Sequence, residues 1–182
     1  MRTFIALELP DEVKNEIVKL QNYLAKLDLF SGKFTEPNDL HLTLKFMGDI
    51  ADDKLKLIKE KLSNLKFKEF EAETDILGVF NERFIRIIWI SLKSKELFEL
   101  QKDIDEILAH DFPKEPRFMA HITIARPKFI RKREELLKTV RTIKFEKLKF
   151  KINTIKFKES KLLKKGPEYS DLMVVKANPD TL

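Results

Sequence analysis

Apolar residues recur at helical spacing in four segments of the chain. In residues 11–28 they fall three or four positions apart, at Val13, Ile17, Leu20, Leu24 and Leu27. This spacing puts one apolar stripe along an amphipathic helix. Pro10 fits the first turn of that helix, where its missing N–H costs nothing. The same pattern predicts helices over residues 52–65, 95–110 and 132–142.

Shorter alternating or apolar segments predict strands. These segments are residues 2–9, 40–47, 68–80, 84–92, 118–126, 145–158 and 169–176. Within 145–158 the apolar positions change phase, from the even positions of Phe150 and Ile152 to the odd positions of Ile155 and Phe157. A bulge near Asn153 and Thr154 would explain this change, because an extra residue reverses the alternation of a strand.

The order of predicted elements repeats. A strand, a long helix and a second strand occupy residues 2–47, and the same order occupies residues 84–126. We therefore expect an α+β fold in which two pseudo-symmetric lobes of mainly antiparallel sheet carry helices on their outer faces. The lobes would form a central cleft within one bilobal domain spanning residues 1–182.

Composition restricts the kinds of site. The chain has no cysteine, which excludes disulfides, thiol nucleophiles and thiolate metal sites. Its apolar runs are too short to span a bilayer, and the first residues lack a signal-peptide cleavage site. We expect a cytoplasmic monomer that does not bind membranes. The formal charge of +6 fits either a soluble, lysine-rich surface or a polyanionic partner such as a nucleic acid.

Two of the three histidines stand in the same local frame. In DLHLTLKFMG at 39–48 and MAHITIARPK at 119–128, His41 and His121 are each followed by an apolar residue, a threonine and another apolar residue. A single histidine in a strand is usually structural, but two matching frames favour a shared functional site. His110 has no such frame, and we expect it at a helix C-terminus, where a cation is favourable.

Each frame predicts a strand with a polar front and an apolar back. Because side chains alternate along a strand, His41, Thr43 and Lys45 would share one face, and His121 and Thr123 would share the corresponding face of the second strand. The leucines and isoleucines between them would face the core. This pattern is typical of a strand that lines a cleft.

Two imidazoles and two hydroxyls suit chemistry at phosphorus. One histidine can act as general base beside the entering oxygen and the other as general acid beside the leaving oxygen. The threonine hydroxyls can donate hydrogen bonds to the oxygens on which charge develops. Lys45 and Arg126 would add positive charge. Neither frame has a further histidine or a carboxylate at ligand spacing, so we predict no metal.

Both motifs, their separation and the doubled order of elements resemble the 2H phosphoesterases. Within these, the chain is similar to the bacterial and archaeal 2'-5' RNA ligases, also called RNA 2',3'-cyclic phosphodiesterases. The resemblance covers nearly the whole chain. It includes RTFIALELP in the opening strand, LHLTLKFMG and AHITIAR in the histidine motifs, LGVF and IIWI in the central strands, and ESKLLKKGPEYSDL in the closing segment.

The resemblance implies metal-independent hydrolysis of RNA 2',3'-cyclic phosphate ends, including those of tRNA halves, to 2'-phosphates without a cofactor. By this resemblance His41 protonates the leaving 3'-oxygen and His121 accepts a proton from water, while Thr43 and Thr123 hold the phosphoryl oxygens. The same geometry would also join a cyclic phosphate end to a 5'-hydroxyl RNA through a 2'-5' bond.

Several interpretations remain open from the sequence. Tyr169 or Phe4 would stack on a base, but for Phe4 we favour a place in the core. Arg126 matches a common arginine of the family, yet strict alternation points it away from His121. The alternative function is a nucleotide- or RNA-binding module without turnover. Two intact histidine–threonine pairs argue against it, because binding alone would not need two titratable groups.

Overall fold

The computed structural model describes residues 1–164 and 166–179. The described residues contain four α-helices and a 3₁₀ turn: α1 (Asp11–Lys26), η1 (Pro37–Asp39), α2 (Asp52–Ser63), α3 (Lys95–Leu108) and α4 (Arg133–Thr142). They also contain nine strands: β1 (Arg2–Glu8), β2 (Phe30–Phe34), β3 (His41–Asp49), β4 (Phe70–Val79), β5 (Ile88–Lys93), β6 (His121–Ile130), β7 (Lys149–Ile152), β8 (Thr154–Leu163) and β9 (Gly166–Lys176).

The nine described strands form one sheet in the order β7-β4-β5-β6-β3-β1-β8-β9, with β2 pairing with the outer part of β6. The paired strands run antiparallel. The sheet divides into two lobes, β7-β4-β5-β6 and β3-β1-β8-β9, which meet where Leu42 of β3 pairs with Ile122 of β6. This arrangement confirms the predicted α+β fold with two lobes of antiparallel sheet.

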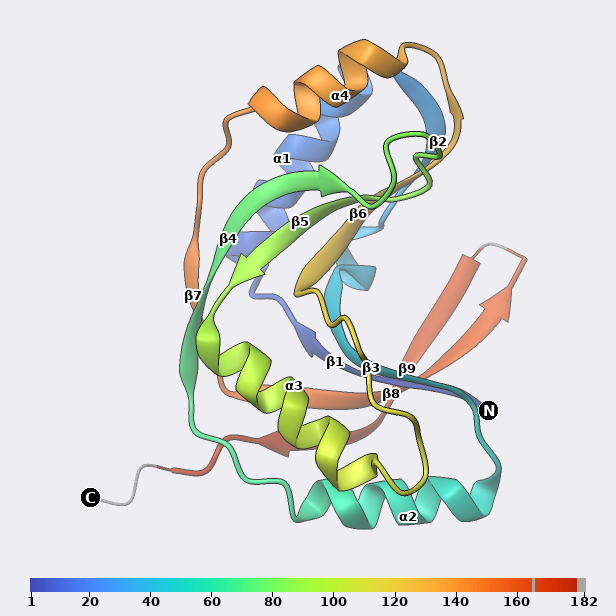
Figure 1. The fold of residues 1–182 in the computed structure, drawn as a ribbon, viewed down its shortest axis with the longest axis vertical. Helices are drawn as coiled ribbons and strands as arrows, with labels where there is room; N and C mark the ends of the chain where they lie inside the picture. The colour runs from blue at the N-terminus through green and yellow to red at the C-terminus, as the bar shows by residue number, and fades with distance from the viewer. Residues whose placement is uncertain (165, 180–182) are drawn as a thin grey trace.

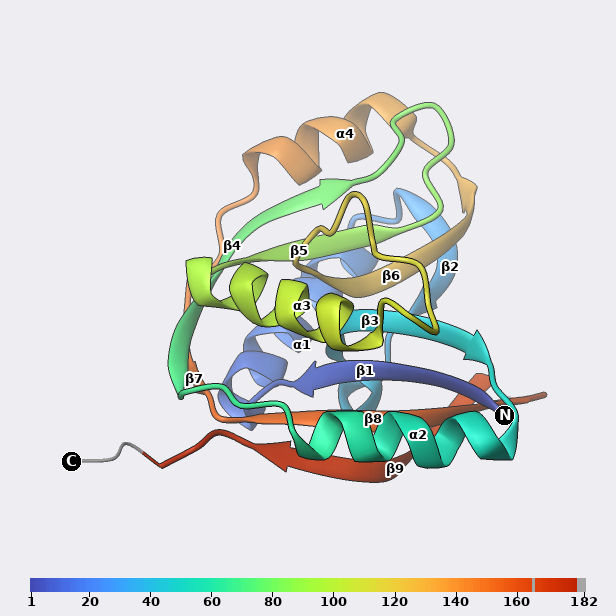
Figure 2. The same ribbon diagram turned by 60° about the horizontal axis from the view of Figure 1, so that its bottom comes forward.

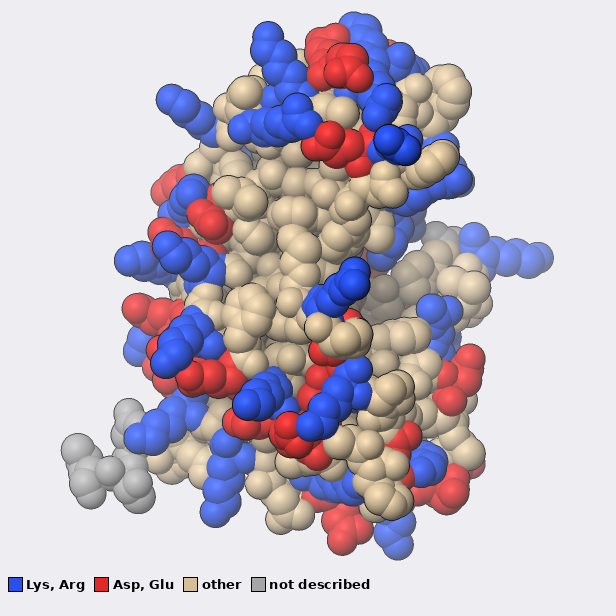
Figure 3. Space-filling view, viewed as in Figure 1, with Lys and Arg blue, Asp and Glu red and all other residues tan. Residues whose placement is uncertain are grey.

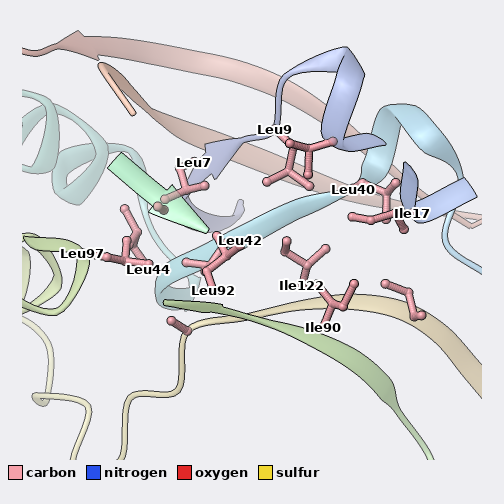
Figure 4. Close-up of a cluster of buried hydrophobic side chains, with 14 of the residues drawn as sticks. Leu7, Leu9, Ile17, Leu40, Leu42, Leu44, Ile90, Leu92, Leu97 and Ile122 are labelled. Atoms are coloured by element: carbon pink, nitrogen blue, oxygen red, sulfur yellow. The ribbon is translucent and has the colours of Figure 1, made fainter. Parts of the chain in front are cut away.

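The two long helices cross over between the lobes: each precedes the histidine strand of one lobe but packs on the histidine strand of the other lobe. Helix α1, which precedes β3, contacts β6, whereas α3, which precedes β6, contacts β3. Helix α4 packs on β4, and α2 packs beside α3 (Figures 1 and 2). The apolar stripe predicted for α1 is buried from Val13 to Leu24, whereas Leu27 follows the helix and is partly buried. The backs of both histidine strands, including Leu42 and Ile122, are buried as well (Figure 4).

Some predicted elements differ from the structure. The bulge predicted near Asn153 and Thr154 is wrong, because the chain changes strand there: β7 pairs with β4, and β8 pairs with β1 in the other lobe. The two apolar phases therefore belong to two strands. Strand β2 was not predicted, and β5 begins at Ile88, so residues 81–87 form a loop. His110 lies at the C-terminal end of α3, as expected, and its side chain is 92% exposed.

Helices in the described residues are all too short, or not apolar enough, to cross a membrane.

Candidate active site

A cavity of about 610 Å³ lies between the two lobes and receives side chains from both. Its lining includes His41, Thr43, His121, Thr123, Arg126 and Tyr169. In Figure 3 the surface is hollowed on the side where the β8–β9 hairpin stands away from β2 and β6. The structure thus brings both predicted histidine–threonine pairs into one cleft.

The register between β3 and β6 sets the geometry of the four side chains. Leu42 pairs with Ile122 in an antiparallel arrangement. His41 consequently faces Thr123 across the strand pair, and Thr43 faces His121, all on the cavity side. Diagonal neighbours in such a pair lie about 7–8 Å apart, with their Cβ atoms somewhat closer, so the two histidines occupy opposite corners of the arrangement. Both imidazoles line the same cavity.

The ring of His41 is fixed by its backbone neighbour and by burial. Its Nδ1 lies 2.6 Å from the Asp39 carbonyl oxygen, which can only accept, so Nδ1 carries the proton in the neutral ring and Nε2 remains the acceptor. Burial lowers the pKa of His41, the Asp39 hydrogen bond opposes this, and the nearby cation of Lys158 lowers the pKa further. Bound negative charge would favour the protonated form.

His121 is held in the same way. Its Nδ1 donates to the Met119 carbonyl oxygen at 2.8 Å, again two residues earlier in the chain. Burial lowers its pKa, the Met119 hydrogen bond opposes this, and the charge of Arg126 lowers it slightly further. A neutral imidazole at neutral pH is ready to accept a proton through Nε2, the state that a general base needs.

Aromatic rings flank both histidines. The ring centroids of Phe4 and Tyr169 lie 5.1 and 5.3 Å from that of His41, and the Phe80 centroid lies 4.8 Å from that of His121. Phe4 is 4% exposed, as the core role requires, and it also lines the cavity, where stacking on a base stays a prediction. Tyr169 lines the cavity beside it. The sequence motifs did not identify Phe80, whose contact with His121 depends on the β4–β5–β6 order.

The expectation that Lys45 shares a face with His41 is wrong. In the β1–β3 pair, Ile5 faces Lys45 and Ala6 faces Thr43, which leaves Leu44 as an extra residue. Such a bulge reverses the alternation that follows it. Lys45 is therefore buried on the opposite side of the strand, with an ion pair to Asp105 of α3. It does not line the cavity, and its predicted contact with the substrate is corrected accordingly.

An equivalent bulge in β6 has the opposite effect on Arg126. Ala125 faces Ile88 and Thr123 faces Trp89, so Ile124 is the extra residue. Arg126 returns to the face of His121 and lines the cavity, which explains how it reaches a position that strict alternation denies it. Across the β2–β6 pair it faces Lys33, which also lines the cavity. Positive charge at the cavity suits an anionic substrate.

Four charged side chains, of which Glu8 and Lys158 lie near His41, form a closed network that the sequence did not reveal. The Lys158 amino group lies 2.7 Å from carboxylate oxygens of both Glu8 and Asp171. Lys156 contacts the same two residues at 2.8 and 2.7 Å. Glu8 faces His41 across β1 and β3. Although burial favours the neutral acid, these hydrogen bonds hold the pKa of Glu8 below its ordinary value. The network thus keeps fixed charge beside His41.

No three histidine, cysteine, aspartate or glutamate side chains among the described residues lie close enough together to hold a metal ion.

Comparison with known proteins places this geometry in a family. The model of the LigT like Phosphoesterase family matches the chain twice, over residues 7–89 and 90–169. The RNA 2',3'-cyclic phosphodiesterase of Methanocaldococcus jannaschii is 36% identical over 138 residues, which are 75% of this chain and 77% of that protein. The protein of the same name from Archaeoglobus fulgidus is 35% identical over 179 residues, 96% and 99% of the two chains.

Solved structures agree with this assignment. The crystal structure of TT0787 of Thermus thermophilus has a TM-score of 0.76 and 25% identity, and the match covers 100% of both chains. Escherichia coli LigT in its apo form has a TM-score of 0.80 at 19% identity, over 97% of this chain and 96% of that chain, which supports the fold. The two family matches each contain one histidine motif, and the chain belongs to the LigT-like phosphoesterases, a group of 2H phosphoesterases.

Proposed function

We propose that this protein hydrolyses the 2',3'-cyclic phosphate end of RNA to a 2'-phosphate through paired-histidine acid–base catalysis. The observation that carries the proposal is the arrangement of His41, Thr43, His121 and Thr123 in one cavity, with the histidines at opposite corners. The relatives named RNA 2',3'-cyclic phosphodiesterase support the choice of substrate.

The reaction needs an entering and a leaving oxygen on opposite sides of phosphorus. Nε2 of neutral His121 accepts a proton from water as its oxygen forms a bond to phosphorus. The bond from phosphorus to the 3'-oxygen breaks, and protonated His41 gives its Nε2 proton to that oxygen. The product carries a 2'-phosphate and a free 3'-hydroxyl. Each histidine then returns to its starting state by exchanging one proton with solvent.

The remaining cavity residues stabilise the charge that develops on phosphorus. The hydroxyls of Thr43 and Thr123 each stand across the strand pair from a histidine and donate hydrogen bonds to the non-bridging oxygens. Arg126 and Lys33 supply positive charge beside this position. The approach of the phosphate's negative charge also raises the pKa of His41, which prepares it to act as the acid.

The test is ring opening of defined RNA ends. Oligonucleotides that end in a 2',3'-cyclic phosphate, from mononucleotides to tRNA halves, are incubated with enzyme in EDTA, and the 2'-phosphate is identified by chromatography against 2'- and 3'-phosphate standards. We expect 2'-phosphate only, and a loss of about 10²–10⁴-fold in rate for His41→Ala or His121→Ala. Tight binding of these RNAs without ring opening would instead establish the non-catalytic binding module.

A further inference from the structure

Phe80 occupies a position that hydrolysis leaves unexplained. It lies just past the end of β4, its ring meets His121 edge-on at 4.8 Å between centroids, and it packs on Trp89 at 5.7 Å. Phe80 is nevertheless 51% exposed. Over β4 and β5, the centre of Figure 3 shows a surface without Lys, Arg, Asp or Glu. An exposed aromatic ring thus stands beside the proposed general base.

The adjoining loop extends this surface with both aromatic and cationic groups. Phe84 is 71% exposed, and Arg83 and Arg86, one residue before it and two residues after it, are exposed as well. The loop is held in place below these side chains: Asn81 Oδ1 accepts from the backbone N–H groups of Arg83 and Phe84 at 2.8 and 3.1 Å. Ile85 is buried at 5% exposure. Exposed phenylalanines between arginines on a fixed loop are typical of surfaces that stack bases and attract phosphates.

The positions of the leaving and entering oxygens indicate which nucleoside would lie beside Phe80. The ribose of the cyclic phosphate is tied to the leaving 3'-oxygen, and therefore lies on the side of His41, Phe4 and Tyr169. The entering oxygen lies on the opposite side, at His121 and Phe80. Water needs no aromatic support there. A nucleoside whose 5'-hydroxyl reaches Nε2 of His121 would bring its base toward the exposed ring of Phe80.

We propose that Phe80, with the loop of residues 81–87, forms a binding site for a second nucleic-acid strand that enters with a 5'-hydroxyl. This inference rests on the proposed function, since it assigns an acceptor to the same two histidines. Phe80 would decide how the cyclic phosphate is partitioned between water and the acceptor.

The step balances without a cofactor or a redox partner. The 5'-oxygen of the acceptor forms a bond to phosphorus and loses its proton to His121. The bond to the 3'-oxygen breaks, and that oxygen receives the proton of His41. The product is a 2'-5' phosphodiester with a free 3'-hydroxyl. The reverse reaction exchanges the roles of the two histidines and regenerates the cyclic phosphate.

The experiment measures partition within one reaction, so that any general effect on the catalytic machinery cancels. A cyclic phosphate RNA is mixed with excess 5'-hydroxyl oligonucleotide, and the ratio of 2'-5' linked product to 2'-phosphate is measured. We expect Phe80→Ala to lower this ratio about 5- to 150-fold, the range that corresponds to the loss of one base stack. Phe80→Trp, which retains an aromatic face, should restore it.

Two controls make the assay specific. Tyr23 on α1 is 51% exposed, as Phe80 is, and Tyr23→Ala should leave the ratio unchanged. Methanol is an acceptor with a hydroxyl and no base, so its partition against water should be equal in wild type and Phe80→Ala.

The outcomes separate the two proposals. If the wild type does not open the cyclic phosphate, the proposed function fails, and this inference fails with it. If the wild type hydrolyses but forms no 2'-5' product at millimolar acceptor, or if Phe80→Ala keeps the wild-type ratio, only the acceptor site is overturned. A rise in KM for longer RNAs with an unchanged ratio would show that Phe80 binds the substrate strand instead.

Discussion

The buried position of Lys45 predicts that its replacement lowers the stability of the protein and not its activity. Its side chain is 4% exposed and forms an ion pair with Asp105, which is 6% exposed. Its Nζ also donates to the Pro113 carbonyl oxygen at 2.8 Å. Asp105 accepts two more hydrogen bonds, from Gln101 Nε2 at 2.9 Å and from the Glu115 N–H at 2.8 Å. The pair therefore joins β3, α3 and the loop that follows α3.

Lys45→Met keeps most of the side-chain volume but leaves Asp105 charged and buried without its cation. Removing one partner of a buried pair costs about 3–5 kcal/mol. For a chain of this size, each 1 kcal/mol lowers Tm by about 2–4 °C, so we expect a fall of about 6–20 °C. Urea unfolding and a thermal scan measure both quantities. The double variant Lys45→Met/Asp105→Leu should recover most of the loss, because neither charge then remains buried.

The activity of the Lys45→Met variant tests whether this residue has a structural role alone. At a temperature well below the variant's Tm, kcat/KM for ring opening should stay within about twofold of wild type, because no catalytic group is altered. The opposite result, unchanged stability with a fall of tenfold or more in kcat/KM, would refute this assignment. It would restore the role at the substrate that alternation in DLHLTLKFMG predicts.

Three further results are expected of the proposed catalytic groups. A nitrophenyl phosphodiester, whose leaving group hardly needs protonation, should rescue His41→Ala far more than His121→Ala, and rescue in the opposite sense would reverse the two roles. The pH profile of kcat/KM should be bell-shaped with its maximum on the acid side of 6.5, the ordinary histidine pKa, because burial lowers the pKa of both His41 and His121. A maximum above pH 7.5 would contradict this. EDTA should leave the rate unchanged, and loss of activity restored by zinc or magnesium would show that a metal takes part.

Local sequence was sufficient to predict the histidine strands and the long helices. His41 and Thr43 lie two positions apart between apolar residues, and this period identifies both the strand and its polar face. The stripe of α1 is equally regular. Information of this kind is contained in a few neighbouring residues, and the structure agrees with it wherever the alternation is unbroken.

Sequence could not reveal where the alternation breaks. The extra residues Leu44 and Ile124 look like ordinary strand positions, and only their pairing with β1 and β5 shows the bulges. For this reason Lys45 and Arg126 each lie on the face of the strand opposite to the one that alternation predicts. The charge network at Lys158 was equally hidden, because it depends on β8 lying between β1 and β9.

The order of strands in the sheet also fixes the order in which the two lobes can be completed during synthesis. Strands β4, β5, β6 and β7 come from one continuous segment of the chain. The lobe that contains β1 and β3 is complete only after β8 and β9 have been synthesised. Contacts between distant segments form late because closing a long loop costs entropy before the contacts reward it. A ribosome-bound chain would therefore assemble the half that carries His121 first. Proton donation by His41 would begin only after residues 154–176 have emerged and closed the other half around it.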